Sequence, residues 1–142
     1  MKRQSVKYQT QWASQFYASA ELTRRGYLVS LTFGNAPVVD LLVTSPCGRH
    51  FMVDIKGQST PNFWLIQPRE QDNDLFYIFV LLPKPIVESP AYFIMSCAEM
   101  LMERNAYRDH IMSNSGQYRD ELGGFNFSAV KKYQNHWDTL PK

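Results

Sequence analysis

Residues 38–43 read VVDLLV and residues 51–56 read FMVDIK. Both stretches are short, apolar and rich in branched side chains, and a Pro- and Gly-containing turn at 46–48 separates them. They therefore predict two antiparallel strands that lie next to each other. Each strand carries one aspartate among its apolar residues, and we expect Asp40 and Asp54 to lie side by side.

Side chains along a strand alternate between its two faces. Asp54 and Lys56 are therefore expected on one face of their strand, with Ile55 on the other. A carboxylate inside an apolar strand is costly to bury without a partner. Two interpretations of Asp40 fit this observation: a partly solvated or salt-bridged strand end, or a metal ligand.

Two carboxylates and an ammonium at one place have a specific chemical use. Carboxylate and carbonyl oxygens are the ligands that Mg²⁺ or Mn²⁺ prefers, so Asp40, Asp54 and the backbone carbonyl of Ile55 are the candidate metal ligands. A bound metal polarises a phosphoryl oxygen and helps to generate hydroxide from water. Lys56 is the candidate group for orienting that water, assisting its deprotonation or offsetting transition-state charge.

Around these strands, the sequence predicts an α/β (α+β) fold: a mixed central sheet flanked by helices, in a single domain over residues 1–142. In the first helix, Trp12, Phe16 and Ala20 recur at helical spacing and are expected to face the core, with Ala13 and Tyr17 widening the stripe. The expected helices cover 5–25, 97–112 and 128–137, and the expected strands 27–33, 38–43, 50–56, 63–66, 75–82 and 91–96.

Residues 37–40 (PVVD) and 54–56 (DIK) resemble the motif of the PD-(D/E)XK nuclease superfamily, which has the restriction-endonuclease-like fold. Two features depart from the family pattern. The proline precedes Asp40 by three positions instead of one, and the second acid is Asp instead of the more frequent Glu.

The resemblance extends to the first helix. Residues 20–27 (AELTRRGY) look like the acid-bearing helix of archaeal Holliday-junction resolvases and their relatives, which implies that Glu21 is a further metal ligand or contacts a metal-bound water. Glu21 follows Tyr17 by one turn, at the edge of the predicted stripe. Gln58 continues the alternation of Asp54 and Lys56, and is either a site residue or part of a loop surface.

The resemblance implies a metal-dependent nuclease that hydrolyses DNA phosphodiester bonds, an endonuclease of restriction, repair or recombination type. The expected partners are duplex or branched DNA and a second copy of the chain, as a homodimer. The alternative is an inactive nuclease-fold protein that acts as a nucleic-acid-binding or protein-interaction module.

Composition limits the remaining possibilities. A net charge of +2 implies that nucleic acid is bound only through a local basic patch. Cys47 and Cys97 form no CxxC pair, which argues against a disulfide framework or a zinc site. No signal peptide and no membrane-spanning run of apolar residues is evident, so we expect a cytoplasmic protein without a membrane partner.

Overall fold

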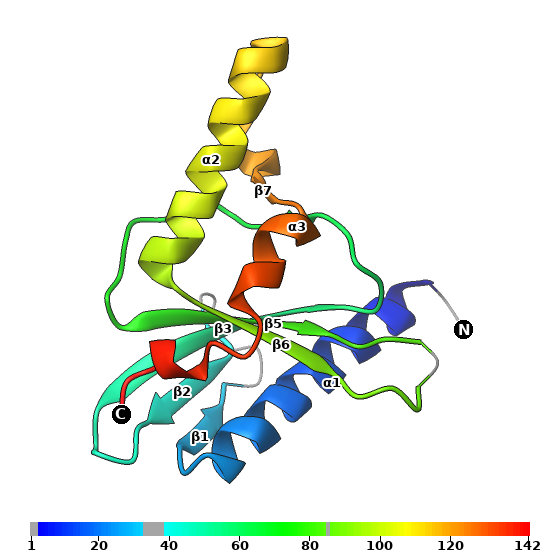
Figure 1. The fold of residues 1–142 in the computed structure, drawn as a ribbon. Coiled ribbons are helices and arrows are strands. Elements are labelled where there is room, and N and C mark those ends of the chain that lie inside the picture. The colour runs from blue at the N-terminus through cyan, green and yellow to red at the C-terminus, as the bar shows by residue number, and fades with distance from the viewer. Residues whose placement is uncertain (1–2, 33–38, 85) are drawn as a thin grey trace.

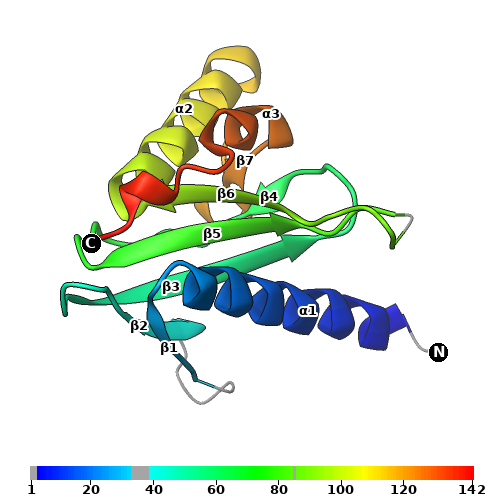
Figure 2. The same ribbon diagram turned by 60° about the horizontal axis from the view of Figure 1, so that its bottom comes forward.

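The computed structural model describes residues 3–32, 39–84 and 86–142, with side chains described from residue 6. The predicted fold class is confirmed: a five-stranded mixed sheet lies between helix α1 on one face and helices α2 and α3 on the other (Figures 1 and 2). The helices are α1 (Arg3–Arg24), α2 (Cys97–Ser115) and α3 (Phe127–Val130), and the strands are β1 (Leu28–Leu31), β2 (Leu41–Thr44), β3 (His50–Gln58), β4 (Trp64–Leu65), β5 (Leu75–Leu81), β6 (Ala91–Ser96) and β7 (Gly124–Phe125).

The strand order in the main sheet is β1-β2-β3-β5-β6. The first three strands form the predicted antiparallel meander, β3 then pairs with β5 in parallel, and β5 pairs with β6 antiparallel. Strands β4 and β7 pair separately as a small second sheet. The parallel register places Asp54 of β3 directly beside Tyr77 of β5, which matters for the site described below.

Strand β5 is buried along six of its seven residues, and its side chains alternate between two hydrophobic clusters. Phe76, Ile78 and Val80 join the cluster beneath α1. Tyr77 and Phe79 join the cluster beneath α2 and α3. A strand buried on both faces is a continuous apolar run, as this stretch is in the sequence.

The predicted orientation of α1 is wrong. Trp12 and Phe16 are 37% and 53% exposed and stack on each other at 5.9 Å. The buried face instead consists of small or slender side chains, with Ser14, Ala18 and Leu22 fully buried. Small side chains let the helix axis lie close to the sheet, and the rings of the other stripe would not fit into that space.

The C-terminal segment also differs from the predicted helix over 128–137. It consists of the four-residue α3, with Asn126 at the N-cap position instead of Ser128 and no side-chain capping bond, followed by two short 3₁₀ turns, Lys131–Tyr133 and Trp137–Thr139. Asn135 interrupts the helical path with a left-handed backbone, φ 58°. Val130, Tyr133 and Trp137 are buried nevertheless, so burial of these residues requires no continuous helix.

Other boundaries agree within a few residues. Helix α2 begins at the predicted Cys97 because Ser96 and Glu99 form a reciprocal capping box. Trp64 is 2% exposed, as expected for an aromatic residue in a strand.

Phe33, Pro37 and Val38, which belonged to predicted strands or to the nuclease motif, lie outside the described residues. Within the described part of the chain, none of the helices has the length and apolarity to cross a membrane.

Candidate functional site

The site lies where strands β2 and β3 separate. Backbone pairing between them ends at Leu41 and Val53, and the N–H of Asp40 still donates to the carbonyl of Val53 (3.1 Å). The next ladder donor, the N–H of Ile55, bonds to the carboxylate Oδ2 of Asp40 at 2.7 Å. The Asp40 side chain therefore replaces a backbone acceptor. Asp40 immediately precedes β2, one position outside the strand in which it was predicted.

Helix α1 satisfies two further polar groups at this separation. Gln15 donates through Nε2 to Oδ1 of Asp40 (3.1 Å), and Gln11 donates to the carbonyl of Ile55 (2.9 Å). These two glutamines lie four residues apart and so share one face of the helix. Gly57 permits the close approach, since a Cβ at this position would collide with the side chain of Ser14.

Asp54 and Lys56 lie on the same face of β3, as the alternation predicts. The ammonium of Lys56 is 3.1 Å from Oδ1 of Asp54, and the two side chains are 34% and 14% exposed, respectively. Asp54 acts on the pKa of Asp40 through a side-chain hydrogen bond, and Lys56 acts on it through its charge. The three predicted residues Asp40, Asp54 and Lys56 are thus together.

The carboxyl groups of both aspartates are poorly stabilised as anions. Burial raises the pKa of Asp40, against the opposing effects of the Ile55 N–H and the Lys56 charge. Burial also raises the pKa of Asp54, where the Lys56 charge opposes the shift and the negative charge of Asp40 adds to it. A pair of partly buried acids with raised pKa values favours the uptake of a proton or of a cation.

A small hollow of about 250 Å³ opens beside Asp54 and Lys56, and Arg69 and Tyr77 line it. Arg69 donates through Nη1 to the hydroxyl of Tyr77 (3.3 Å), while its buried Nε has no partner among the described residues. Burial raises the pKa of Tyr77 to about 12, so its hydroxyl stays protonated. The hollow therefore presents cationic and neutral donors next to the acids.

Sequence reasoning did not find Arg69 or Tyr77. Tyr77 belongs to a predicted buried strand, and only its parallel register with Asp54 places it at the site. Arg69 lies in the connection between β4 and β5, where the sequence pattern gives no position for its side chain. The glutamines of α1 were missed because the helix was oriented by its aromatic stripe.

The structure does not bring Glu21 to the acids. Its carboxylate pairs with Arg24 (3.5 Å) and Arg25 (3.2 Å) on the same helix. Glu21 follows Gln15 by six residues, which amounts to about 9 Å along the axis and a different helix face. The amides of Gln11 and Gln15, instead of a carboxylate at position 21, meet the Asp40 region.

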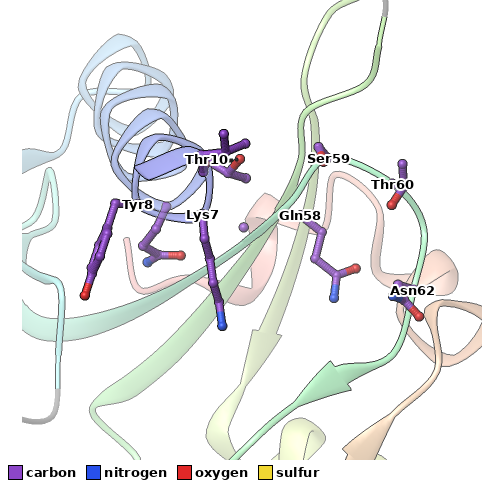
Figure 3. Close-up of a pocket in the computed structure, with 10 residues that line it drawn as sticks. Lys7, Tyr8, Thr10, Gln58, Ser59, Thr60 and Asn62 are labelled. Carbon is purple, nitrogen blue, oxygen red and sulfur yellow. Dashed lines mark hydrogen bonds between the residues drawn. The ribbon is translucent and has the colours of Figure 1, made fainter. Parts of the chain in front are cut away.

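Gln58 ends strand β3 and lies beyond the acid pair. Its Nε2 donates to the carbonyl of Phe63 (2.7 Å), and its Oε1 is buried without a partner in the described part of the chain. The side chain lines a separate groove between the start of α1 and the loop after β3 (Figure 3). The structure therefore assigns Gln58 to a neighbouring polar surface.

The donor set is chemically suited to a hard divalent cation. Asp40 and Asp54 supply carboxylate oxygens, and the carbonyl of Ile55, which accepts one hydrogen bond from Gln11, retains a second lone pair. Mg²⁺ is commonly held by one or two carboxylates together with waters and substrate phosphates. Among the residues that the structure describes, no cluster of three or more His, Cys, Asp or Glu side chains forms a metal site.

Comparisons with family models, with curated proteins and with solved structures gave no match.

Proposed function

We propose that this protein is a metal-dependent nuclease with a restriction-endonuclease-like fold, which hydrolyses phosphodiester bonds in duplex or branched DNA. The observation that carries the proposal is the separation of β2 and β3 at the Asp40–Asp54 pair. There, a sheet that is otherwise apolar gathers two acids with raised pKa values and the ammonium of Lys56. Acids with raised pKa values beside a cation cluster at functional sites, which supports the proposal.

In this proposal, Asp40, Asp54 and the Ile55 carbonyl hold Mg²⁺ or Mn²⁺. When bound, the metal supplies Lewis-acid activation of the phosphoryl group and of water. Lys56 stands 3.1 Å from Asp54 and can donate to the attacking water or to a non-bridging phosphate oxygen. Its charge offsets the negative charge that develops as water adds to phosphorus and the bond to the leaving oxygen breaks.

In this proposal, Arg69 contributes to binding the substrate before the reaction. Its guanidinium has unused donor capacity at the buried Nε and faces the hollow that Asp54 and Lys56 share. Guanidinium groups bind phosphate through paired N–H donors. We assign Arg69 to holding a substrate phosphate beside the two acids, with Tyr77 fixing its orientation.

A second candidate is an inactive protein of the same fold that binds nucleic acid or another protein. The contacts of Gln11 and Gln15 favour this candidate, because neutral amides satisfy the Ile55 carbonyl and the Asp40 carboxylate without adding a metal ligand. Such contacts stabilise the strand separation whether or not the site hydrolyses a substrate. Activity is therefore the discriminating measurement.

The decisive experiment incubates the protein with supercoiled, linear, branched and single-stranded DNA in Mg²⁺, Mn²⁺ or EDTA. We expect cutting that requires metal and falls at least about 100-fold in Asp54→Asn and in Lys56→Met, as for the loss of a transition-state contact. Asp74→Asn and Lys131→Met are the matched controls, because both side chains are solvent-exposed and neither lines the acid pair.

Two outcomes would overturn the proposal. One is a parent protein that cuts none of these substrates and binds no Mn²⁺ by calorimetry. The other is cutting that survives in Asp54→Asn at the level of Asp74→Asn. Light scattering of the same sample tests the proposed homodimer, since a monomeric mass under cutting conditions contradicts it.

A further inference from the structure

A groove of about 920 Å³ runs between the first turns of α1 and the loop that follows β3 (Figure 3). Its volume falls within the roughly 300–1,000 Å³ of pockets that enclose small ligands. Lys7 extends into it from α1 and Gln58 from β3, and Asn62 closes the loop side. Thr10, Gln11, Ser59 and Thr60 supply further hydroxyl and amide groups.

The charge of the groove favours an anionic ligand with polar edges. Lys7 is its cationic side chain, and no carboxylate is found among the described residues that line it. The remaining polar groups are neutral amides and hydroxyls, which bind through hydrogen bonds. A nucleotide has both features, since it carries a phosphate at one end and a base with donors and acceptors at the other.

Gln58 gives the groove a hydrogen-bond acceptor that has no donor among the described residues. Its Nε2 is fixed by the 2.7 Å hydrogen bond to the carbonyl of Phe63, so the orientation of the amide is set. Its Oε1 is buried and lacks a donor within the described residues. A buried acceptor without a donor is costly, and a ligand that supplies an N–H group removes this cost. The exocyclic amino and ring N–H groups of bases are such donors.

The groove also continues from the proposed cutting site. Gln58 follows Lys56 by two residues on the same strand, which places the two positions about 7 Å apart. Gln11 lines the groove and also donates to the carbonyl of Ile55, so it borders both places. The two places are therefore close enough for neighbouring nucleotides of one strand to contact both.

We propose that this groove binds one DNA strand next to the phosphate that is cut, with Lys7 on a flanking phosphate and Gln58 Oε1 accepting from a base N–H group. The proposal rests on the proposed function, because the acid pair defines which phosphate is flanked. It adds a subsite for an unpaired nucleotide, formed by residues that take no part in the hydrolytic chemistry.

The test measures binding separately from cutting. Fluorescence anisotropy in EDTA follows a labelled single-stranded 12-mer and a 12-mer of the same length whose central sites are abasic. We expect Lys7→Ala to weaken both oligonucleotides roughly 3- to 10-fold and to reduce the slope of log affinity against log salt by about 0.7. Lys131→Ala, on an exposed 3₁₀ turn, is the matched control.

Gln58→Met tests the base contact, because it keeps a chain of similar length and removes the acceptor; it also removes the Nε2 donor to the Phe63 carbonyl, an effect that binding of the abasic 12-mer reveals. We expect a loss of roughly 3- to 10-fold for the normal 12-mer and no change for the abasic one. Gln134→Met, an exposed position, is the control. Thermal unfolding of each variant checks its fold, and the exposed Lys7 keeps the proposal testable if Gln58→Met does not fold.

The outcomes separate the two proposals. Equal binding by the parent, Lys7→Ala and Lys131→Ala, or no binding of the 12-mer by the parent, overturns the groove even if DNA is cut. Full competition by a free deoxynucleoside monophosphate at the affinity of the 12-mer also overturns it, because the strand is then not the ligand. Binding that responds as expected, in a protein that does not cut, retains the groove and rejects the nuclease.

Discussion

Two clusters of partly buried charge lie on this sheet, and they are built in opposite ways. In α2, Arg104 is 5% exposed and donates to the carbonyl of Ile66 (2.7 Å), to Oδ1 of Asp120 (2.7 Å) and to the carbonyl of Asp120. The neighbouring Glu103 accepts from the hydroxyl of Tyr133 (2.8 Å) and pairs with Lys132 (2.6 Å). Each charge in this cluster has a partner of the opposite sign.

The acid pair beside β3 is less well compensated. Two carboxylates share Lys56 as their nearest cation, burial raises the pKa of both, and Arg69 Nε lacks a partner within the described chain. By contrast, the hydrogen bond from Arg104 lowers the pKa of Asp120. The comparison teaches that burial of charge alone does not identify a functional site. In the α2 cluster each charge is paired with an opposite charge, whereas burial raises the pKa of both acids beside β3, a combination that is more frequent at functional sites.

The largest expected effect is on the anchoring cluster. Arg104→Leu removes three hydrogen bonds and leaves the carbonyl of Ile66 without its donor, so we expect the free energy of unfolding to fall by about 3 kcal/mol. Urea denaturation measures this loss. Arg108→Leu, which removes an exposed pair with Asp109, is the control and is expected to change it by less than about 1 kcal/mol. Equal losses in the two variants would contradict the anchoring role.

A smaller effect of opposite sign is expected at the acid pair. Asp54→Asn removes a partly buried negative charge that burial and Asp40 disfavour, and loses one partly exposed ion pair with Lys56. We expect the free energy of unfolding at pH 7 to rise by up to about 1 kcal/mol while cutting is lost, the usual trade between stability and activity. A loss above about 1 kcal/mol would show that Asp54 holds the fold together.

The smallest effect is on how stability depends on pH. Asp40 and Asp54 keep their protons in the folded protein at pH values where the unfolded chain, with its ordinary pKa of 3.8, has lost them. Raising the pH from 3.8 through the raised pKa values therefore lowers the free energy of unfolding. Asp120, with a lowered pKa, acts in reverse: its contribution is present above 3.8 and is lost as the pH falls through its folded pKa.

Denaturation of the parent, of Asp40→Asn/Asp54→Asn and of Asp120→Asn across this pH range separates the two contributions. The double variant is expected to lose the decline in stability toward neutral pH, and Asp120→Asn to lose part of the decline toward acid pH. Identical pH profiles for the three proteins would refute the contrast between the clusters.

Short-range pattern predicted the acid pair well. Alternation along a strand depends on local geometry, so the positions of Asp54 and Lys56 on one face of β3 followed from the sequence. A turn of a few residues fixes which strand lies beside β3, and this turn brought Asp40 close to Asp54. The orientation of α1 was not predictable in the same way. The helix has two candidate stripes, and the one that packs is chosen by Gly57, whose missing side chain admits Ser14.

The residues that complete the site depend on contacts distant in the sequence. Tyr77 reaches Asp54 through a parallel register, which no hairpin turn fixes. Gln11 and Gln15 reach the separated strands only because α1 presents its small face to the sheet. The break in the C-terminal segment consists of the extended Gln134 and the left-handed Asn135, at positions where the apolar helical pattern itself continues.

The separation of β2 from β3 has a further consequence, which concerns edge-to-edge pairing of strands from different chains. Beyond Val53, the side of β3 that faces β2 has no strand partner among the described residues, and an open strand edge can recruit another chain. The carboxylate of Asp40 occupies the N–H of Ile55, and the amide of Gln11 occupies its carbonyl. The side chains that prepare the proposed metal site therefore also occupy the backbone groups of a strand edge that lies beneath α1, which leaves them unavailable to another chain.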